Sequence, residues 1–137
     1  ETAKTMQPIA EYGKGRGRSY GKPGRNKGQV AYGRGYVQLT WDENYEKADK
    51  NLGLNGALVA DYDLAMRADI AARIMRDGMV GGWFTGRGFG TYLPVIGPAS
   101  RDAFRAARRI INGADENDLI AGYALAFQSA LQAGGWE

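Results

Sequence analysis

The chain has 137 residues, with 18 basic and 15 acidic side chains, 21 glycines, and neither cysteine nor histidine. The absence of these two residue types excludes disulfides, thiolate zinc sites, thiol nucleophiles, Ser-His triads and imidazole acid-base catalysis, so that carboxylates are the acid-base groups that remain. The length suits one domain, and the net charge of +3 favours anionic partners without choosing among them. No apolar run approaches the roughly 20 residues of a membrane span, and no signal-peptide pattern is present.

The first segments along the chain are predicted to be irregular. Residues 1–12 resemble the end of a helix or a short helical turn, interrupted at Pro8 because proline lacks a backbone N–H and disfavours helix at Gln7. Residues 13–28 have the sequence GKGRGRSYGKPGRNKG, in which six cationic residues are spaced by glycines and almost nothing is apolar. This composition predicts a mobile basic loop, called the basic loop below.

The next segments are predicted to change from extended chain to helix. Residues 29–41 alternate in part between apolar and other side chains, which indicates an extended, hairpin-like segment. Asp42 is predicted to cap a helix over residues 43–52, with Tyr45 and Ala48 on its inner face and Gly53 at its end.

A longer helix is predicted over residues 69–77, where Ile70, Ala71, Ile74 and Met75 form an apolar stripe and Gly78 stands at the C-terminal cap position. Gly81 to Pro98 is rich in glycine, proline and aromatic residues. We expect a long irregular segment there, of a kind that is more often functional than idle.

Two helices are predicted near the C-terminus. Ser100 is expected to cap a helix over residues 101–111. A last helix, starting at Asp115 or Asn117 and reaching about Gln132, is apolar around most of its circumference. This pattern predicts a buried central helix, and the whole chain is predicted to be mainly α.

Glu1 and Glu11 are the candidates for an acid-base pair, since hydrolysis of a glycosidic bond needs one protonated carboxyl group and one base or nucleophile. On a straight helix their ten-residue separation corresponds to about 15 Å, beyond the roughly 6.5 to 9.5 Å of an inverting pair. The interruption at Pro8 would let Glu11 fold back across a cleft.

A second candidate group is formed by Gln38, Thr40 and Asn44. On an extended segment Gln38 and Thr40 point to the same face, and Asn44 can join them if a turn follows Trp41. Amide and hydroxyl groups suit sugar hydroxyls and an attacking water. The alternative is a polar sheet edge whose side chains hydrogen-bond to their own backbone.

Residues 32–45, YGRGYVQLTWDENY, closely resemble the signature of glycoside hydrolase family 19, which contains chitinases and phage endolysins. The opening ETAKTMQPIAE is similar to the family segment that begins with the catalytic glutamate, and the resemblance continues through residues 78–86 and 108–127. It implies a lysozyme-like helical fold with a small β-hairpin region and long Gly-rich loops. It also implies that residues 1–137 form a single catalytic domain that lacks its N-terminal helix.

The resemblance implies a role for each matching residue in an inverting mechanism. Glu1 matches the general acid, Glu11 the general base of the shorter, phage-type members, and Thr40 the residue that helps to hold the nucleophilic water. The remaining matches are expected to bind substrate: Gln38, Asn44, Asn112, Tyr32 and Trp41. No metal ion or cofactor is required.

The chain departs from the plant chitinases, since it lacks their cysteines and their Cys-Arg-Glu-Asn type segment. It is more similar to the phage and bacterial branch, which implies a monomeric endolysin that cuts β-1,4 bonds of peptidoglycan at the bacterial cell wall or periplasm. A free ammonium group beside the Glu1 carboxylate would favour its ionised form, the opposite of what a general acid needs. We therefore expect the natural protein to extend upstream of Glu1, and this extension to be needed for activity.

Other functions remain open. A chitinase would use the same mechanism on polymers of N-acetylglucosamine, but the basic loop favours peptidoglycan because chitin is not anionic. Arginine-glycine segments also occur in nucleic-acid-binding chains, against which stands the near balance of basic and acidic residues. An inactive relative that only binds wall glycan is disfavoured by the retention of Glu1, Glu11 and Thr40.

Overall fold

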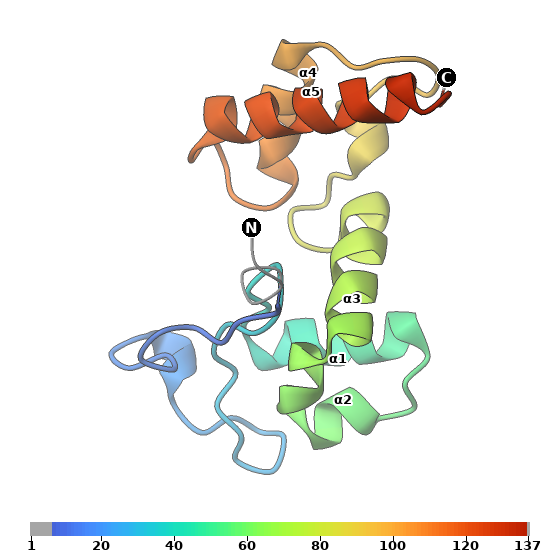
Figure 1. Cartoon of the computed structure of the whole chain (residues 1–137). Helices are drawn as coiled ribbons and strands as arrows, with labels where there is room; N and C mark the ends of the chain where they lie inside the picture. Colours follow the sequence, from blue (N-terminus) through green and yellow to red (C-terminus); the bar gives the residue numbers. More distant parts are fainter. Residues whose placement is uncertain (1–6, 137) are drawn as a thin grey trace. The chain divides into compact units, whose positions relative to one another are not determined.

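The computed structural model describes residues 7–136, which are mainly helical and contain no β-sheet. The predicted mainly α class is therefore confirmed, whereas Glu1 and the rest of the first half of the predicted segment 1–12 lie outside the described residues. Within the described range the chain forms two compact units, residues 7–77 and 78–136. The α-helices in Figure 1 are α1 (Asp42–Leu52), α2 (Ala57–Ala60), α3 (Ala68–Gly81), α4 (Arg101–Ala107) and α5 (Asn117–Ala133).

Helix α1 organises the first unit. It ends where the sequence predicts, since Gly53 has a left-handed φ of 65° and its N–H bonds to the carbonyl oxygens of Asp49 and Lys50. Its start differs by one residue, because Trp41 takes the cap position and Asp42 is already helical. The carboxylate of Asp42 accepts hydrogen bonds from the Tyr62 hydroxyl and the Arg25 N–H instead.

A buried carboxylate joins α1 to the short helix that follows. Asp49 accepts hydrogen bonds from the backbone N–H groups of Gly56 at 2.7 Å, Leu58 at 2.7 Å and Val59 at 3.2 Å. These donors belong to the first turn of α2, which has no helical acceptors for them. Around this contact lie the apolar core residues Tyr45, Ala48, Leu52, Leu58, Tyr62, Ala65, Ile70, Ala71 and Ile74.

Helix α3 is longer than predicted. Ile70, Ala71 and Ile74 are buried, as the apolar stripe predicts, but Met75, the fourth residue of that stripe, is 37% exposed. Gly78 does not end the helix, however, because α3 continues to Gly81. A Cβ atom on Gly78 would collide with the ring of Phe84, so this glycine allows close packing and does not serve as a cap.

Residues 7–41 form turns joined by isolated antiparallel bridges, without a strand of regular length. Arg34 and Leu39 exchange both backbone hydrogen bonds, at 3.2 and 2.9 Å, across a tight turn at Gly35. In the basic loop, a short 3-10 helix covers Ser19–Gly21. Gly15 and Gly21 approach so closely that a Cβ atom on Gly15 would lie 2.8 Å from the Cα atom of Gly21. The basic loop thus has a defined path built from turns.

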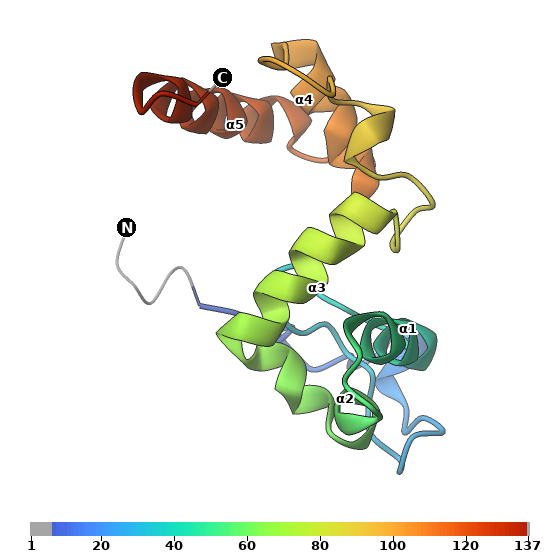
Figure 2. The ribbon, with the colours of Figure 1, turned by 90° about the vertical axis from the view of Figure 1, so that its right-hand side faces the viewer.

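The second unit consists of an irregular segment followed by two packed helices. A 3-10 helix over Phe89–Thr91 lies within the irregular segment. A second 3-10 helix, over Arg108–Ile110, follows the end of α4. The Ser100 hydroxyl accepts a hydrogen bond from the Ala103 N–H at 3.1 Å, which confirms the predicted cap of α4. Helix α5 packs on α4 in both views (Figures 1 and 2).

The prediction that α5 is a buried central helix is wrong for most of its surface. Tyr123 is 59% exposed and Phe127 74% exposed, with Leu119 and Leu131 also exposed along the same face. The reason is that α4 covers only one side of α5, whereas the sequence pattern anticipates partners on several sides. No helix within residues 7–136 has the length and apolar character needed to cross a membrane.

Gly35 offers a direct test of the turn that joins Arg34 to Leu39. Its φ is 81°, and a Cβ atom there would lie 2.8 Å from the carbonyl oxygen of Ala65. Gly35→Ala is expected to reduce the free energy of unfolding by about 3 kcal/mol, from backbone strain and collision together. Gly28→Ala is the matched control, because Gly28 has a φ of 69° with open space around it, and should cost only about 1 kcal/mol. Equal losses in urea unfolding would show that the contact with Ala65 is unimportant.

Candidate functional site

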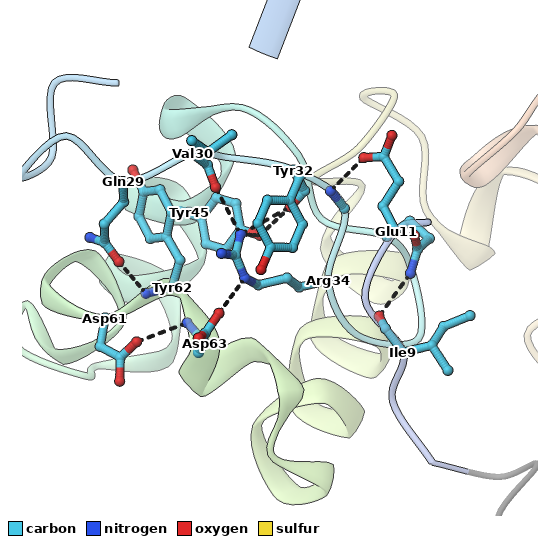
Figure 3. A network of polar contacts seen from close by, with 12 residues as sticks. Ile9, Glu11, Gln29, Val30, Tyr32, Arg34, Tyr45, Asp61, Tyr62 and Asp63 are labelled. Atoms are coloured by element: carbon cyan, nitrogen blue, oxygen red, sulfur yellow. Dashed lines mark hydrogen bonds and ion pairs between the residues drawn. The ribbon is translucent and has the colours of Figure 1, made fainter. Parts of the chain in front are cut away.

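The buried guanidinium of Arg34 lies within a network of polar contacts in the first unit (Figure 3). Its carbon atom lies 3.5 Å from the centroid of the Tyr32 ring. Nη1 donates hydrogen bonds to the carbonyl oxygens of Val30 at 3.0 Å and Tyr32 at 3.2 Å, and to the hydroxyl of Tyr45 at 3.1 Å. Nε donates to Asp63 at 2.8 Å. Because the Asp63 side chain is 70% exposed, water solvates the acidic end of this ion pair.

Two stacked tyrosines extend this network to α1. The rings of Tyr45 and Tyr62 lie 3.9 Å apart and nearly parallel, at 16°. The Tyr45 hydroxyl donates to the Tyr32 carbonyl oxygen at 2.7 Å, and the Tyr62 hydroxyl donates to Asp42 at 2.6 Å. Burial raises the pKa of Tyr45, and burial together with the bond to Asp42 raises the pKa of Tyr62 to about 12. Both phenols therefore keep their protons, and with them these hydrogen bonds, at neutral pH.

Glu11 is attached to the same network through Gly33. The Glu11 N–H donates to the Gly33 carbonyl oxygen at 2.7 Å, and the Gly33 N–H donates to Glu11 Oε2 at 3.0 Å. The hydroxyl of Tyr20 donates to the other carboxylate oxygen, Oε1, at 3.0 Å. Desolvation and the bond to Glu11 raise the pKa of Tyr20, so it stays a donor. The Glu11 carboxylate is thus oriented through both of its oxygens.

The Gln38 side chain packs against Gly33. It adopts a left-handed φ of 53°, and its Nε2 donates to the carbonyl oxygens of Ile9 and Gly35, both at 3.0 Å. A Cβ atom on Gly33 would lie 2.8 Å from Gln38 Oε1. A side chain on Gly33 would therefore displace the Gln38 amide group, while Glu11 holds the Gly33 backbone.

Thr40 and Asn44 form a local contact. The Asn44 Nδ2 donates to the Thr40 carbonyl oxygen at 2.8 Å, as the first turn of α1 begins. The side-chain amides of Asn44 and Gln38 thus donate their hydrogen bonds to backbone carbonyl oxygens. Bonds from these side chains to the backbone are what the alternative of a polar sheet edge predicts. A substrate role for Thr40, Gln38 and Asn44 stays a prediction.

The two aromatic residues of the motif have different surroundings. Tyr32 is buried, and its ring supports the Arg34 guanidinium. Trp41 is 45% exposed and meets the Tyr20 ring edge-on, with centroids 5.3 Å apart at 74°. Of this pair, Trp41 is the one whose aromatic surface is open to solvent.

Two further predicted residues lie outside the described part of the first unit. Glu1 lies outside the described residues. Asn112 belongs to the second unit, where it is exposed and its Nδ2 approaches Asp115 Oδ2 at 3.4 Å. The structure therefore brings together Glu11, Gln38 and Trp41 by way of Gly33 and Tyr20.

Tyr20 and Arg25 are the residues that the sequence analysis missed. Tyr20 is the one aromatic residue of the basic loop, and this isolation was a usable signal. Arg25 binds Glu46 through two hydrogen bonds, at 2.8 and 2.7 Å, and Glu43 at 3.0 Å. Since Tyr20 holds Glu11 and Arg25 holds α1, the basic loop is fastened at two points and is not merely solvated.

Comparison with protein-family models, with curated proteins and with solved structures found no match. The resemblance to glycoside hydrolase family 19 therefore depends on the sequence motifs alone, and what it implies is treated below as a proposal. In the part of the chain that the structure describes, no three acidic side chains come together as a metal ion would require.

Arg34→Met is expected to lower the free energy of unfolding by about 3 kcal/mol, because methionine fills similar space but leaves the Val30 carbonyl oxygen without its side-chain donor and removes one of the two donors to the Tyr32 carbonyl oxygen. Thermal unfolding followed by near-UV circular dichroism measures the loss. Arg67→Met is the control, since Arg67 forms an exposed ion pair with Asp69. A similar fall in Tm for both variants would contradict the central role of Arg34.

The contact between Arg25 and Glu46 predicts part of the acid sensitivity. The hydrogen bonds from Arg25, followed by that from Asn26, lower the pKa of Glu46 from its ordinary 4.5 to about 2. A lowered pKa in the folded state contributes stability above pH 4.5 that is lost as the pH falls towards 2. Glu46→Gln should therefore flatten the dependence of Tm on pH in this window, more at low salt than at high salt because the pair is partly exposed. Glu116→Gln, which changes an exposed carboxyl group of the second unit, should leave the slope intact.

Proposed function

We propose that the chain is an inverting glycoside hydrolase of lysozyme-like fold that cleaves β-1,4 bonds of bacterial peptidoglycan, as an endolysin does. One observation carries the proposal. The segment containing Glu11 and the segment that begins with Tyr32 are the two that most resemble family 19, and they meet through two hydrogen bonds between Glu11 and Gly33, one of which the Gly33 N–H donates to the Glu11 carboxylate. Two motifs that are separate in sequence thus contact each other at the proposed acid-base group, Glu11.

Glu11 has the contacts expected of a general base. Each of its oxygens accepts one hydrogen bond, from Tyr20 or Gly33, and retains a lone pair that can accept a proton from water. In the inverting reaction, this water attacks the anomeric carbon while the bond to the leaving oxygen breaks. The proton of the water passes to Glu11, and the resemblance assigns to Glu1 the proton that the leaving oxygen receives.

The basic loop supports peptidoglycan as the substrate. Residues 13–28 contain six cations and no acidic residue, and of these cations Arg25 pairs with Glu43 and Glu46. The loop therefore carries a positive field next to Glu11, to which Tyr20 attaches it. Peptide-stem carboxylates and teichoic acids are attracted by such a field, whereas chitin, which has no charge, is not.

The test measures reducing ends released from purified peptidoglycan by the protein at its natural length. Glu11→Gln is expected to lower kcat at least about 100-fold, the usual contribution of a positioned acid-base group, while the Tm stays close to that of the parent. Glu116→Gln is the matched control and should retain full activity. Reducing ends at N-acetylmuramic acid with inverted anomeric configuration are the expected products.

Three outcomes would overturn parts of the proposal. Release of free amines would mean that the enzyme cleaves amide bonds. Faster turnover of chitin than of peptidoglycan would make the chain a chitinase with the same machinery. Unchanged kcat in Glu11→Gln would remove Glu11 from the mechanism.

A further inference from the structure

A pocket of about 230 Å³ lies in the first unit, between the basic loop and the start of α1. The loop contributes residues from Ser19 to Gly24, among them Tyr20 and Lys22, and the helix side contributes Trp41, Asp42 and Glu43. The loop residues lie outside the motifs that resemble family 19.

The wall where the loop meets the helix is tightly built. A Cβ atom on Gly24 would collide with the carboxylate of Asp42, so the two segments touch there without a gap. The Gly24 N–H bonds to the Gln29 carbonyl oxygen at 2.8 Å, and the Arg25 N–H bonds to Asp42 at 3.1 Å. Tyr62 holds the other oxygen of Asp42 at 2.6 Å. The pocket is therefore preformed, as ligand pockets usually are.

The lining combines one aromatic surface with polar groups. Trp41 keeps 45% of its surface exposed, and it does so at a φ of 71°, a left-handed conformation that is costly for a non-glycine residue. The edge-on contact with Tyr20 fixes one side of its ring. An exposed indole beside hydroxyl and charged groups suits a sugar ring, which has an apolar face and a polar rim. The volume is below that of pockets for drug-sized molecules, and so suits a single ring.

The charged residues that line the pocket differ in whether their side chains already have partners within the protein. Glu43 pairs with Arg25 at 3.0 Å, and Asp42 accepts the two hydrogen bonds described above. Lys22 is exposed, and within residues 7–136 no hydrogen bond or ion pair engages its ammonium group. A ligand that enters the pocket thus meets occupied carboxylates and an available cation.

We propose that this pocket is a subsite for one hexopyranose that carries a carboxylate substituent, with its ring stacked on Trp41 and its carboxylate paired with Lys22. The inference rests on the proposed function and narrows its substrate to strands whose N-acetylmuramic acid carries a free carboxylate, because attachment of a peptide stem turns that carboxyl group into an amide. Tyr20 connects the subsite to the reaction, since its ring contacts Trp41 while its hydroxyl holds Glu11. The sugar in the subsite is therefore separated from the Glu11 carboxylate by a single side chain.

The experiment titrates the chain with N-acetylmuramic acid and, separately, with N-acetylglucosamine, and follows the indole N–H signal of Trp41 by NMR. Trp41→Phe assigns the signal. N-acetylmuramic acid is expected to shift it with an affinity at least 5-fold higher than that of N-acetylglucosamine. Lys22→Ala should abolish this preference, as should 1 M salt, whereas Lys50→Ala, which removes an exposed lysine of α1, should preserve it.

Two results would overturn the inference. An unchanged Trp41 signal with 20 mM of either sugar would remove the subsite, and an equal affinity for the two sugars would remove the role of Lys22. The assay needs no turnover, so its outcome is separate from that of the proposed hydrolysis. Binding of N-acetylmuramic acid without cleavage of peptidoglycan would contradict the proposed hydrolase and support the subsite. Cleavage without a change in the Trp41 signal would support the hydrolase and contradict the subsite.

Discussion

The burial of the Arg34 guanidinium is the constraint on which the first unit depends. A charge taken out of water must find partners for its donors, and here they come from the segment before it, from α1 and from the 3-10 helix over Tyr62–Met66. Three segments that are distant in sequence are thereby held around one side chain. The motif that identifies the family resemblance is, in physical terms, first a packing motif.

The helices were predictable where a single local signal decides their limits. The left-handed glycine after Leu52 and the hydroxyl cap at Ser100 act within one turn of the backbone, so the sequence shows them directly. Gly78 was misread because a glycine that ends a helix and one that admits a neighbouring ring look the same in sequence. The exposed face of α5 was missed for a related reason, since apolar periodicity indicates a need for burial but not which partner supplies it.

The candidate site was predictable only in part. Glu11 and Gln38 were named from their chemistry and then from the resemblance, but their meeting at Gly33 depends on a close backbone approach that no periodicity reveals. The contact between Tyr20 and Glu11 was not predicted, for another reason. Tyr20 lies in a loop of basic and glycine residues, and such a composition ordinarily indicates a solvated segment.

The close approach of Gly15 to Gly21 has a consequence for how this loop can vary. The two backbones touch, and Gly24 meets Asp42 with equally little room, so side chains are excluded at these three positions. The lysines and arginines between them point outward and impose no such restriction on the path. A loop of this shape is therefore defined by the spacing of its glycines. The number of its cations can therefore vary while the path of the chain stays the same.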